Sequence, residues 1–263
     1  MKNAIALLSS NEYAMNTASI FGAIRNIGNW HGDLIVIGHN WEPKNINLFK
    51  SKKVIVLEAK DSGAGLFLEG SKITHPRLNV INRKLLMFSS VFKEWDNILN
   101  IDADFVIRGD VNSMFDQDGD ICFDKEVCPI WYHFFETSSD EKRAILRVVV
   151  DPDAESFNFG GMFLRTKILK DDDQTIVDIL NAGEPLLCIM ERFIDVPCSC
   201  IIDQSALNIY YYKKWAQIKG MAFISNESPE IKAAHCTRFH APWSKATPFY
   251  KQFIENQRRF LCS

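Results

Sequence analysis

Short runs that are apolar at nearly every position alternate with segments of helical period in the first half of the chain. The runs lie at 4–8 (AIALL), 33–38 (DLIVIG), 53–58 (KVIVLE) and 97–101 (NILNI). Over 14–27, apolar residues recur every three or four positions, which predicts a helix. Strands of this kind are buried on both faces, as in a parallel sheet covered by helices. The pattern predicts an α/β fold with a mostly parallel central sheet flanked by helices.

The remainder of the sequence is less regular. A loop is expected over 59–80 and a turn at 157–161 (FNFGG). Further helices are expected at 82–92, 173–182 and 203–218, and further strands at 120–123 and 161–165. The three aspartates at 171–173 are interpreted as a solvated helix start, where carboxylates suit the helix dipole. No repeat or Pro/Gly-rich linker divides the chain, so a single domain is expected.

Composition excludes several classes of protein. The 263 residues carry a formal net charge of -3, which argues against a nucleic-acid-binding protein with a basic face. No apolar run approaches the roughly 20 residues of a membrane span, and no signal peptide is expected. Seven scattered cysteines favour free thiols and a cytoplasmic location. Cys198 and Cys200 lack a second close pair that would complete a zinc site.

Two aspartates directly follow the apolar run 97–101. Side chains two apart on an extended segment point to the same side, so Asp102 and Asp104 should converge. They would lie at the carboxyl end of a strand, where open α/β sheets bind ligands. Close carboxylates repel unless a cation lies between them, and Mg²⁺ or Mn²⁺ would complete its shell with phosphate oxygens. The pair therefore points to nucleotide-diphosphate chemistry, with a plain polar turn as the alternative.

Several segments, taken in order, carry a resemblance to a known family. They are LLSSNEYAMNTASIFGAI (7–24), NILNIDADFVIRGDVNSMFD (97–116), FNFGGMFL (157–164), DQSALN (203–208) and HCTRFHAPW (235–243). Together they resemble the GT-A-fold glycosyltransferases of family 8, the glycogenin and lipopolysaccharide galactosyltransferase family. The resemblance implies one Rossmann-like GT-A domain over 1–263. Its nucleotide-binding half would be 1–116, and its donor-sugar and acceptor half 117–263.

The same resemblance implies a metal site and its surroundings. Two aspartates and a C-terminal histidine hold the metal in that family, which assigns Asp102, Asp104 and His235 to this role. A nitrogen donor beside two carboxylates favours Mn²⁺ over Mg²⁺. Ala103, between the aspartates, is implied to contact the donor nucleotide. Lys84 or the adjacent Arg83 is implied to contact a donor phosphate or sugar, and Lys84 is preferred because Leu85 follows it. Such basic pairs are often simply solvated.

The donor pocket also follows from the resemblance. Asp203 would hold sugar hydroxyls, Gln204 would lie near the reacting carbon, and Asn158 would bind the sugar. The alternative for Asp203 is a plain helix N-cap. Residues near the first strand are implied to bind the nucleobase, with the tyrosine stacking on it: Ser9, Asn11 and Tyr13. A tyrosine on a helix edge could equally serve packing alone.

One motif departs from the family pattern. Arg238 and Ala241 stand where the family carries glycine and a lysine that contacts the donor diphosphate. Arg238 or His240 is expected to take over that contact, and an arginine fork matches phosphate oxygens well. The alternative is a weakened or altered donor site.

The sequence thus predicts a retaining, metal-dependent glycosyltransferase that moves a hexose from a UDP-sugar to an acceptor hydroxyl. A non-catalytic nucleotide-sugar-binding or scaffold protein is one alternative. A sugar-nucleotidyltransferase is another, although 9–17 lacks the Gly-rich, basic loop typical of that class. The acceptor, a saccharide or another hydroxyl compound, would be shaped by 125–156 and 244–263. The aromatic run 131–135 either stacks on it or belongs to the core, and a homodimer is left open.

Overall fold

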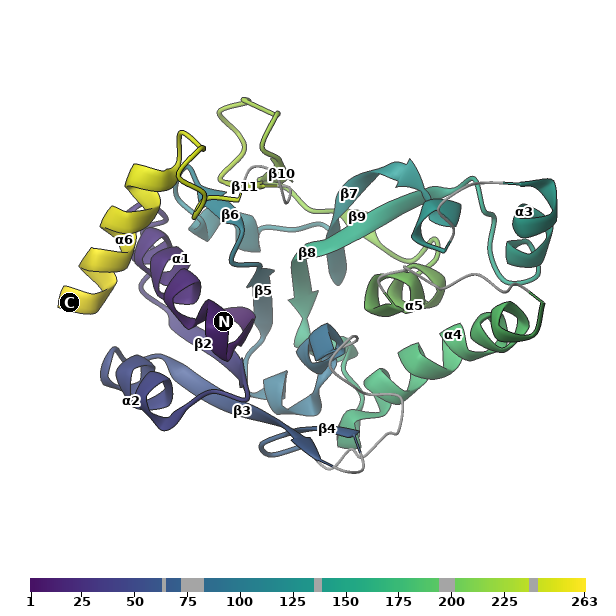
Figure 1. Ribbon diagram of the computed structural model, residues 1–263, viewed down its shortest axis with the longest axis horizontal. Helices are drawn as coiled ribbons and strands as arrows, with labels where there is room; N and C mark the ends of the chain where they lie inside the picture. The colour runs from purple at the N-terminus through teal and green to yellow at the C-terminus, as the bar shows by residue number, and fades with distance from the viewer. Residues whose placement is uncertain (63–64, 72–82, 135–138, 194–201, 237–240) are drawn as a thin grey trace.

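The computed structural model of the protein describes residues 1–62, 65–71, 83–134, 139–193, 202–236 and 241–263. An eight-stranded sheet runs through it in the order β4-β3-β2-β1-β5-β8-β7-β9 (Figure 1). In that order the strands are Gly65–Leu68, Ile55–Ser62, Asp33–His39, Asn3–Ser10, Asn97–Ile101, Glu155–Arg165, Ile121–Pro129 and Ala216–Gln217. The α-helices α1 to α6 are Ala14–Asn26, Pro43–Ser51, Asp140–Leu146, Gln174–Phe193, Ile202–Tyr210 and Tyr250–Cys262.

The parallel part of this sheet is its centre. Strands β3, β2, β1 and β5 run parallel, and Ile5 of β1 pairs with Leu34 on one side and Leu99 on the other. Alternate side chains of β1 enter two different cores. Ile5 lies in the core with α1, α2 and α6, and Ala6 in the core with α4 and α5. The mostly parallel sheet with helices on both faces is therefore as the apolar runs predicted.

The last helix of the chain packs against the first. Helix α6 packs along α1, as Figure 1 shows for the yellow and purple helices. Their backbones approach so closely that a Cβ on Gly22 would lie 2.2 Å from the carbonyl oxygen of Asn256. Phe253 and Phe260 of α6 are buried at the same contact. The C-terminal helix is thus part of the helical layer that covers one face of β1.

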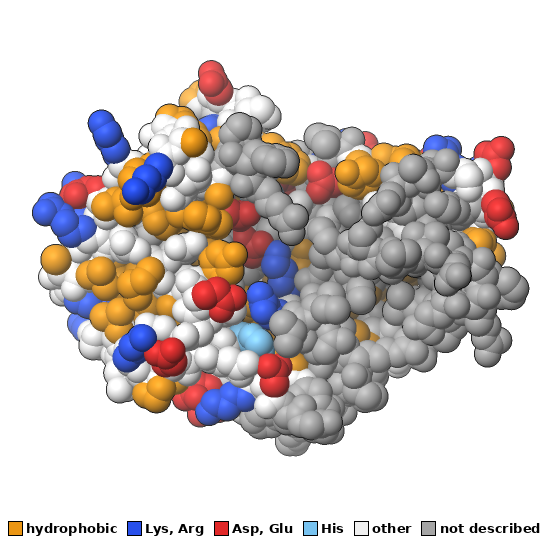
Figure 2. Space-filling view, viewed as in Figure 1, with side chains coloured by type: hydrophobic (Ala, Val, Ile, Leu, Met, Phe, Trp, Pro, Cys, Tyr) orange, Lys and Arg blue, Asp and Glu red, His pale blue; other side chains and the backbone are white. Residues whose placement is uncertain are grey.

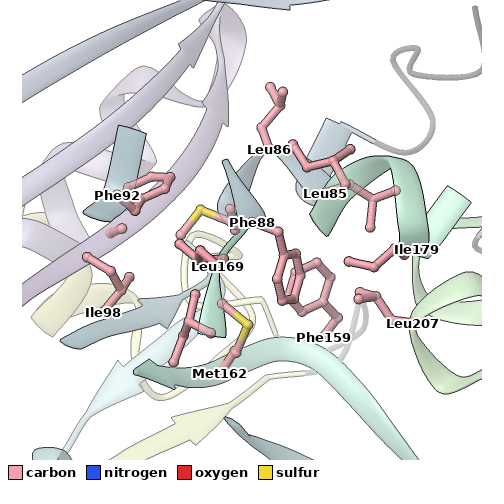
Figure 3. Packing of buried hydrophobic residues seen from close by; sticks show 14 of the residues in the cluster. Leu85, Leu86, Phe88, Phe92, Ile98, Phe159, Met162, Leu169, Ile179 and Leu207 are labelled. Carbon is pink, nitrogen blue, oxygen red and sulfur yellow. The ribbon is translucent and has the colours of Figure 1, made fainter. Parts of the chain in front are cut away.

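The α-helix expected at 82–92 is not formed over the described residues 83–92. The segment forms two short 3₁₀ helices, η2 (Arg83–Phe88) and η3 (Ser90–Glu94), because Ser89 between them is extended. Ser89 instead caps η3, its hydroxyl accepting from the amide of Val91. Four consecutive side chains of η2 are buried: Leu85, Leu86, Met87 and Phe88. Figure 3 shows Leu85 close to Ile179 and Phe88 against Phe159.

Three further boundaries differ from expectation. The expected loop at 59–80 contains the end of β3 and the antiparallel return strand β4. The expected turn at 157–161 lies inside β8, where the glycines leave room for neighbouring side chains. A Cβ on Gly161 would lie 2.4 Å from the sulfur of Met221. The helix expected at 203–218 ends at Tyr210, and 216–217 pairs with β7 instead.

The aspartates at 171–173 are not uniformly solvated. They form η7 (Asp171–Asp173), where Asp173 is fully buried with a positive φ of 57°. Its carboxylate accepts hydrogen bonds from Ser71, Ser89 and Ser90. Although burial alone would raise the pKa of Asp173, these bonds lower it. Asp173 therefore ties η3 and Ser71 to the start of α4.

A small second sheet stands beside the carboxyl end of β5. It has the order β10-β11-β6, with bounds Met221–Phe223, Ala233–His235 and Phe105–Ile107. Strand β11 pairs antiparallel with β6, which places His235 opposite Phe105. Among the helices that the structure describes, none has the length and apolar character needed to cross a membrane.

Candidate functional site

The two aspartates leave the sheet where β5 ends. The amide of Asp102 donates to the carbonyl of Gly160 on β8 at 2.9 Å, so the turn is fixed to the neighbouring strand. Asp104 is held from the other side, because its carbonyl accepts from the amide of Cys236 at 3.0 Å. Both side chains are mostly buried, with 18% and 29% of their surface exposed. The sequence thus places two carboxylates in a partly dry site at the sheet centre.

His235 reaches the same place from β11. Its ring is stacked between Phe105, at 4.8 Å between ring centroids, and Phe223, at 5.4 Å. The Nε2 atom lies 3.4 Å from Oδ2 of Asp104. Gly160 permits this approach, since a Cβ there would lie 3.1 Å from the histidine ring. The structure therefore brings Asp104 and His235 together, as the resemblance implied.

Lys84 also belongs to this site. Its ammonium lies 2.5 Å from Oδ2 of Asp102 and 5.9 Å from the ring centre of Phe159. Burial raises the pKa of Asp102, with the Lys84 charge opposing that rise and the Asp104 charge adding to it. The cation therefore stabilises a carboxylate that desolvation disfavours.

The charge of His235 depends on the same carboxylates. Burial alone would lower the pKa of the imidazole, but the hydrogen bond and charge of Asp104 outweigh burial and raise it. Asp102 and Asp124 add to the rise. The site as a whole is acidic and attracts cations.

Three buried polar atoms here have no hydrogen-bond partner among the described residues: Asp104 Oδ1, Asp124 Oδ2 and His235 Nδ1. Buried polar atoms rarely lack a hydrogen-bond partner, and those without one in the protein usually bind water, an ion or a ligand. Oxygen and imidazole donors of this kind fit a divalent cation chemically. As the described side chains stand, however, no three His, Cys, Asp or Glu residues form a set that could hold an ion. Asp102 faces Lys84 instead.

Asn158 and Gln204 arrange the backbone around this centre. Asn158 accepts from the amide of Gly160 at 2.6 Å and donates to Glu126 at 2.9 Å. Gln204 is buried and donates to the carbonyl of Phe157 at 3.0 Å. Asn158 lies on β8, the strand that carries Gly160, and Gln204 of α5 packs against that strand. Their predicted contacts with a donor sugar stay predictions.

Comparison with known proteins identifies the fold. No protein-family model matches the sequence, and no curated protein gives a significant match. Solved structures do match. The galactosyltransferase LgtC, in complex with donor and acceptor sugar analogues, matches with TM-score 0.63 and 12% identity over 97% of this chain and 95% of LgtC. The protein has a GT-A fold.

Two further glycosyltransferases agree. Mouse xyloside xylosyltransferase 1 matches with TM-score 0.55 and 9% identity over 89% of this chain and 97% of its own. The bifunctional glycosyltransferase WbbM matches with TM-score 0.64 and 17% identity over 97% of this chain, which spans 49% of WbbM. The GT-A fold implied by the sequence resemblance is therefore confirmed.

In this GT-A fold, β1 ends at the predicted nucleobase site. Tyr13 is 42% exposed and lies edge-on to Trp243, with ring centroids 6.0 Å apart. Asn11 is already engaged, since its side chain bonds to Glu42 and Asn45 at the start of α2. Ser9 is buried and donates to the carbonyl of Ser10. Tyr13 is the member of this group that offers a free ring face.

Some predicted residues cannot be placed. Arg238 and His240 lie outside the described residues, and so does the side chain of Asp203, whose backbone is in α5. Ala103 is part-exposed between the two aspartates. Figure 2 shows acidic and basic side chains and a histidine gathered in the middle of one face of the GT-A domain.

Sequence reasoning missed Asp124 and Glu126, which are two apart on β7. Burial raises the pKa of Asp124 to about 6, with the His235 charge opposing that rise. Both residues line an open cleft of about 590 Å³ whose walls include Phe223, the residue that stacks on His235. Their D-x-E spacing in a strand is the same signal that identified the D-x-D pair, and it could have found them.

The aromatic run is divided between core and surface. Phe134 is buried with Ile130, whereas Tyr132 is 58% exposed. Trp131 is partly buried and lies under the guanidinium of Arg143, 5.6 Å from the ring centre. Part of the run therefore belongs to the core, while stacking of the exposed Tyr132 on an acceptor stays a prediction; Phe135 lies outside the described residues.

Proposed function

We propose that this protein is a glycosyltransferase that moves a sugar from a nucleotide-sugar donor to an acceptor hydroxyl. One observation carries the proposal: Asp104 and His235 meet beside Asp102 at the carboxyl end of β5, at the centre of a GT-A sheet. Ligands of open α/β sheets bind at this edge. The full-length structural likeness to glycosyltransferases supports the same reaction class.

We further propose a UDP-sugar donor, Mn²⁺ (or Mg²⁺) and retention of the anomeric configuration, as the sequence resemblance implies. Asp102, Asp104 and His235 would hold the metal, and the unpaired atoms Asp104 Oδ1 and His235 Nδ1 support this donor set. A bound divalent ion would neutralise charge on the leaving diphosphate. Lys84 would contribute a second positive charge at that place.

The donor sugar would lie against β8 and α5. Asn158, Asp203 and Gln204 are the proposed contacts, and the buried amide of Gln204 close to Phe157 supports a rigid wall there. The exposed Tyr13 ring would stack on the nucleobase, with Ser9 and Asn11 ordering the turn beneath it. Ala103 would contact the nucleotide from between the aspartates.

The acceptor would enter through the cleft beside β7. Its lining by Asp124, Glu126 and Glu155 supports a site that accepts hydroxyl groups. We propose that 1–116 serves the nucleotide and 117–263 serves the donor sugar and acceptor. A cytoplasmic location is supported by the free thiols of three described cysteines: Cys122, Cys236 and Cys262. A homodimer stays a prediction.

Calorimetric titration of UDP in the presence of Mn²⁺, and again with a chelator, tests the donor site. We expect binding that the chelator abolishes and that Asp104→Asn removes. Asp116→Asn is the matched control, since it removes an exposed carboxylate of the same segment and should bind normally. If neither UDP nor a panel of nucleotide sugars binds with metal present, the donor site does not exist. Binding without transfer would favour the scaffold alternative.

A further inference from the structure

Lys84 forms an ion pair with Asp102, one of the carboxylates proposed to bind the metal. Its ammonium lies 2.5 Å from Oδ2 of Asp102, whereas Asp104 Oδ1 and His235 Nδ1 are buried without partners. The three proposed ligands are therefore divided: two have unsatisfied atoms, and the third already has a cation. Metal binding and the Lys84–Asp102 ion pair compete for one carboxylate.

The side chain of Lys84 can move away from Asp102 while its backbone stays in place. The residues that follow it in η2 are fully buried, so the backbone is anchored in the core (Figure 3). The side chain of Lys84, by contrast, is 33% exposed. A lysine stem has four rotatable bonds, so its head can move while its Cα stays in place.

We propose that Lys84 is an internal counter-ion, which holds Asp102 in the free protein and is released from it when metal and donor diphosphate bind together. This inference rests on the proposed donor site. The buried carboxylate does not stay unpaired in the absence of metal, because Lys84 neutralises it. The donor diphosphate then offers the displaced ammonium a new anionic partner within the same site. Metal binding is thereby coupled to nucleotide binding.

The coupling has a measurable consequence. Metal alone must break the Lys84–Asp102 ion pair and gives the ammonium no new anion in return, so it binds weakly. Metal with diphosphate replaces that ion pair with another. By thermodynamic linkage, the nucleotide tightens metal binding by the same factor as metal tightens nucleotide binding. Direct ligation by phosphate oxygens contributes to this factor in every variant. The share that belongs to Lys84 disappears when its charge is removed.

The test is Mn²⁺ affinity, measured by electron paramagnetic resonance at about pH 8, with and without UDP. Lys84→Met keeps an unbranched side chain one atom shorter and removes the charge. We expect Mn²⁺ alone to bind this variant about tenfold more tightly than wild type, and the gain from added UDP to be smaller. Lys93→Met is the control: its ammonium pairs with Asp171 at the surface, so its affinities should equal those of wild type.

Two further variants distinguish the effect of the Lys84 charge from the effect of side-chain shape. Lys84→Arg keeps the charge and should bind Mn²⁺ alone as weakly as wild type. Lys84→Gln removes the charge but keeps a polar head, and it should follow Lys84→Met if the methionine variant does not fold.

The outcomes separate the two proposals. Tight Mn²⁺ binding to the wild type only with UDP, and to Lys84→Met without it, supports the counter-ion. If Mn²⁺ and UDP bind the wild type but both neutral variants bind Mn²⁺ no more tightly, the counter-ion is wrong and the donor site stands. If no variant binds Mn²⁺ even with UDP, the metal site is wrong and the counter-ion falls with it.

Discussion

Replacing Asp124 by asparagine should make the protein more stable at neutral and alkaline pH. Asp124 is 2% exposed, its Oδ2 has no partner among the described residues, and burial raises its pKa to about 6. Raising the pKa from 3.8 to about 6 corresponds to about 3 kcal/mol of unfavourable burial of the charge. Asparagine has the same shape without the charge, so it removes this penalty.

The sign of the pH dependence follows from the direction of the shift. The folded protein binds the proton of Asp124 more tightly than the unfolded chain does, so protonation favours folding. The wild type therefore has its full stability from this group below the unfolded pKa, and it loses that stability as the pH rises through about 6. The advantage of Asp124→Asn should be near zero at about pH 4 and approach about 3 kcal/mol at about pH 8.

The assay is urea denaturation of both proteins, with a chelator present, at several pH values. The difference in free energy of unfolding is compared, so that the titration of all other groups cancels. A variant that is less stable than the wild type at pH 8 refutes the reasoning. So does a difference that is equal at both ends of the range, because such a difference does not come from titration.

Three other substitutions test different parts of the structure. Asp104→Asn should lower the pKa of His235, because burial then acts with less opposition; a histidine titration by NMR that shows no change contradicts this. Gly22→Ala should destabilise the protein by about 1–3 kcal/mol in urea denaturation, since the new methyl would lie 2.2 Å from the Asn256 carbonyl oxygen. Gly183→Ala is its control, because its methyl would meet Ala206 at an ordinary 3.4 Å; equal losses in both variants would rule out the close approach. Asp173→Asn should lose about 2–3 kcal/mol at neutral pH and less in acid, where the carboxylate of the wild type is itself protonated; unfolding curves that coincide at neutral pH would contradict the role of the serine bonds.

The central sheet could be predicted because burial on both faces leaves a direct mark on the sequence. The strands β1, β2, β3 and β5 are nearly uninterrupted apolar runs, and each lies between two layers of helices. Short 3₁₀ helices leave no such mark. The apolar spacing of 82–92 fits an α-helix and a pair of 3₁₀ turns equally well, and the extended conformation of Ser89 decides between them.

Long-range contacts were beyond sequence reasoning. Three aspartates in a row at 171–173 read as a solvated helix start, yet Asp173 is buried by serines about 80 to 100 residues earlier in the chain. Gly160 and Gly161 read as a turn, because the side chains that they accommodate, His235 and Met221, come from distant strands. The environment of such residues is set by partners far away in the sequence, not by the residues adjacent to them in the chain.

The candidate site, too, was only partly predictable from the sequence. The apolar run 97–101 was sufficient to place Asp102 and Asp104 at the end of a strand. The extended segment expected between them is instead a turn at 103–104. His235 was assigned by resemblance, and the structure places it 3.4 Å from Asp104. The Lys84–Asp102 ion pair could not be foreseen, because it joins a 3₁₀ helix to a strand end and depends on the burial of η2.

The central claim is sugar transfer from a nucleotide donor at the Asp102, Asp104 and His235 site. Turnover of a panel of UDP-sugars, followed by proton NMR with Mn²⁺ and a set of saccharide acceptors, tests it most directly. We predict release of UDP, a product with the anomeric configuration of the donor, and loss of both in Asp104→Asn with the fold intact. Nucleotide binding without any release of UDP, or turnover that Asp104→Asn leaves unchanged, would contradict the account.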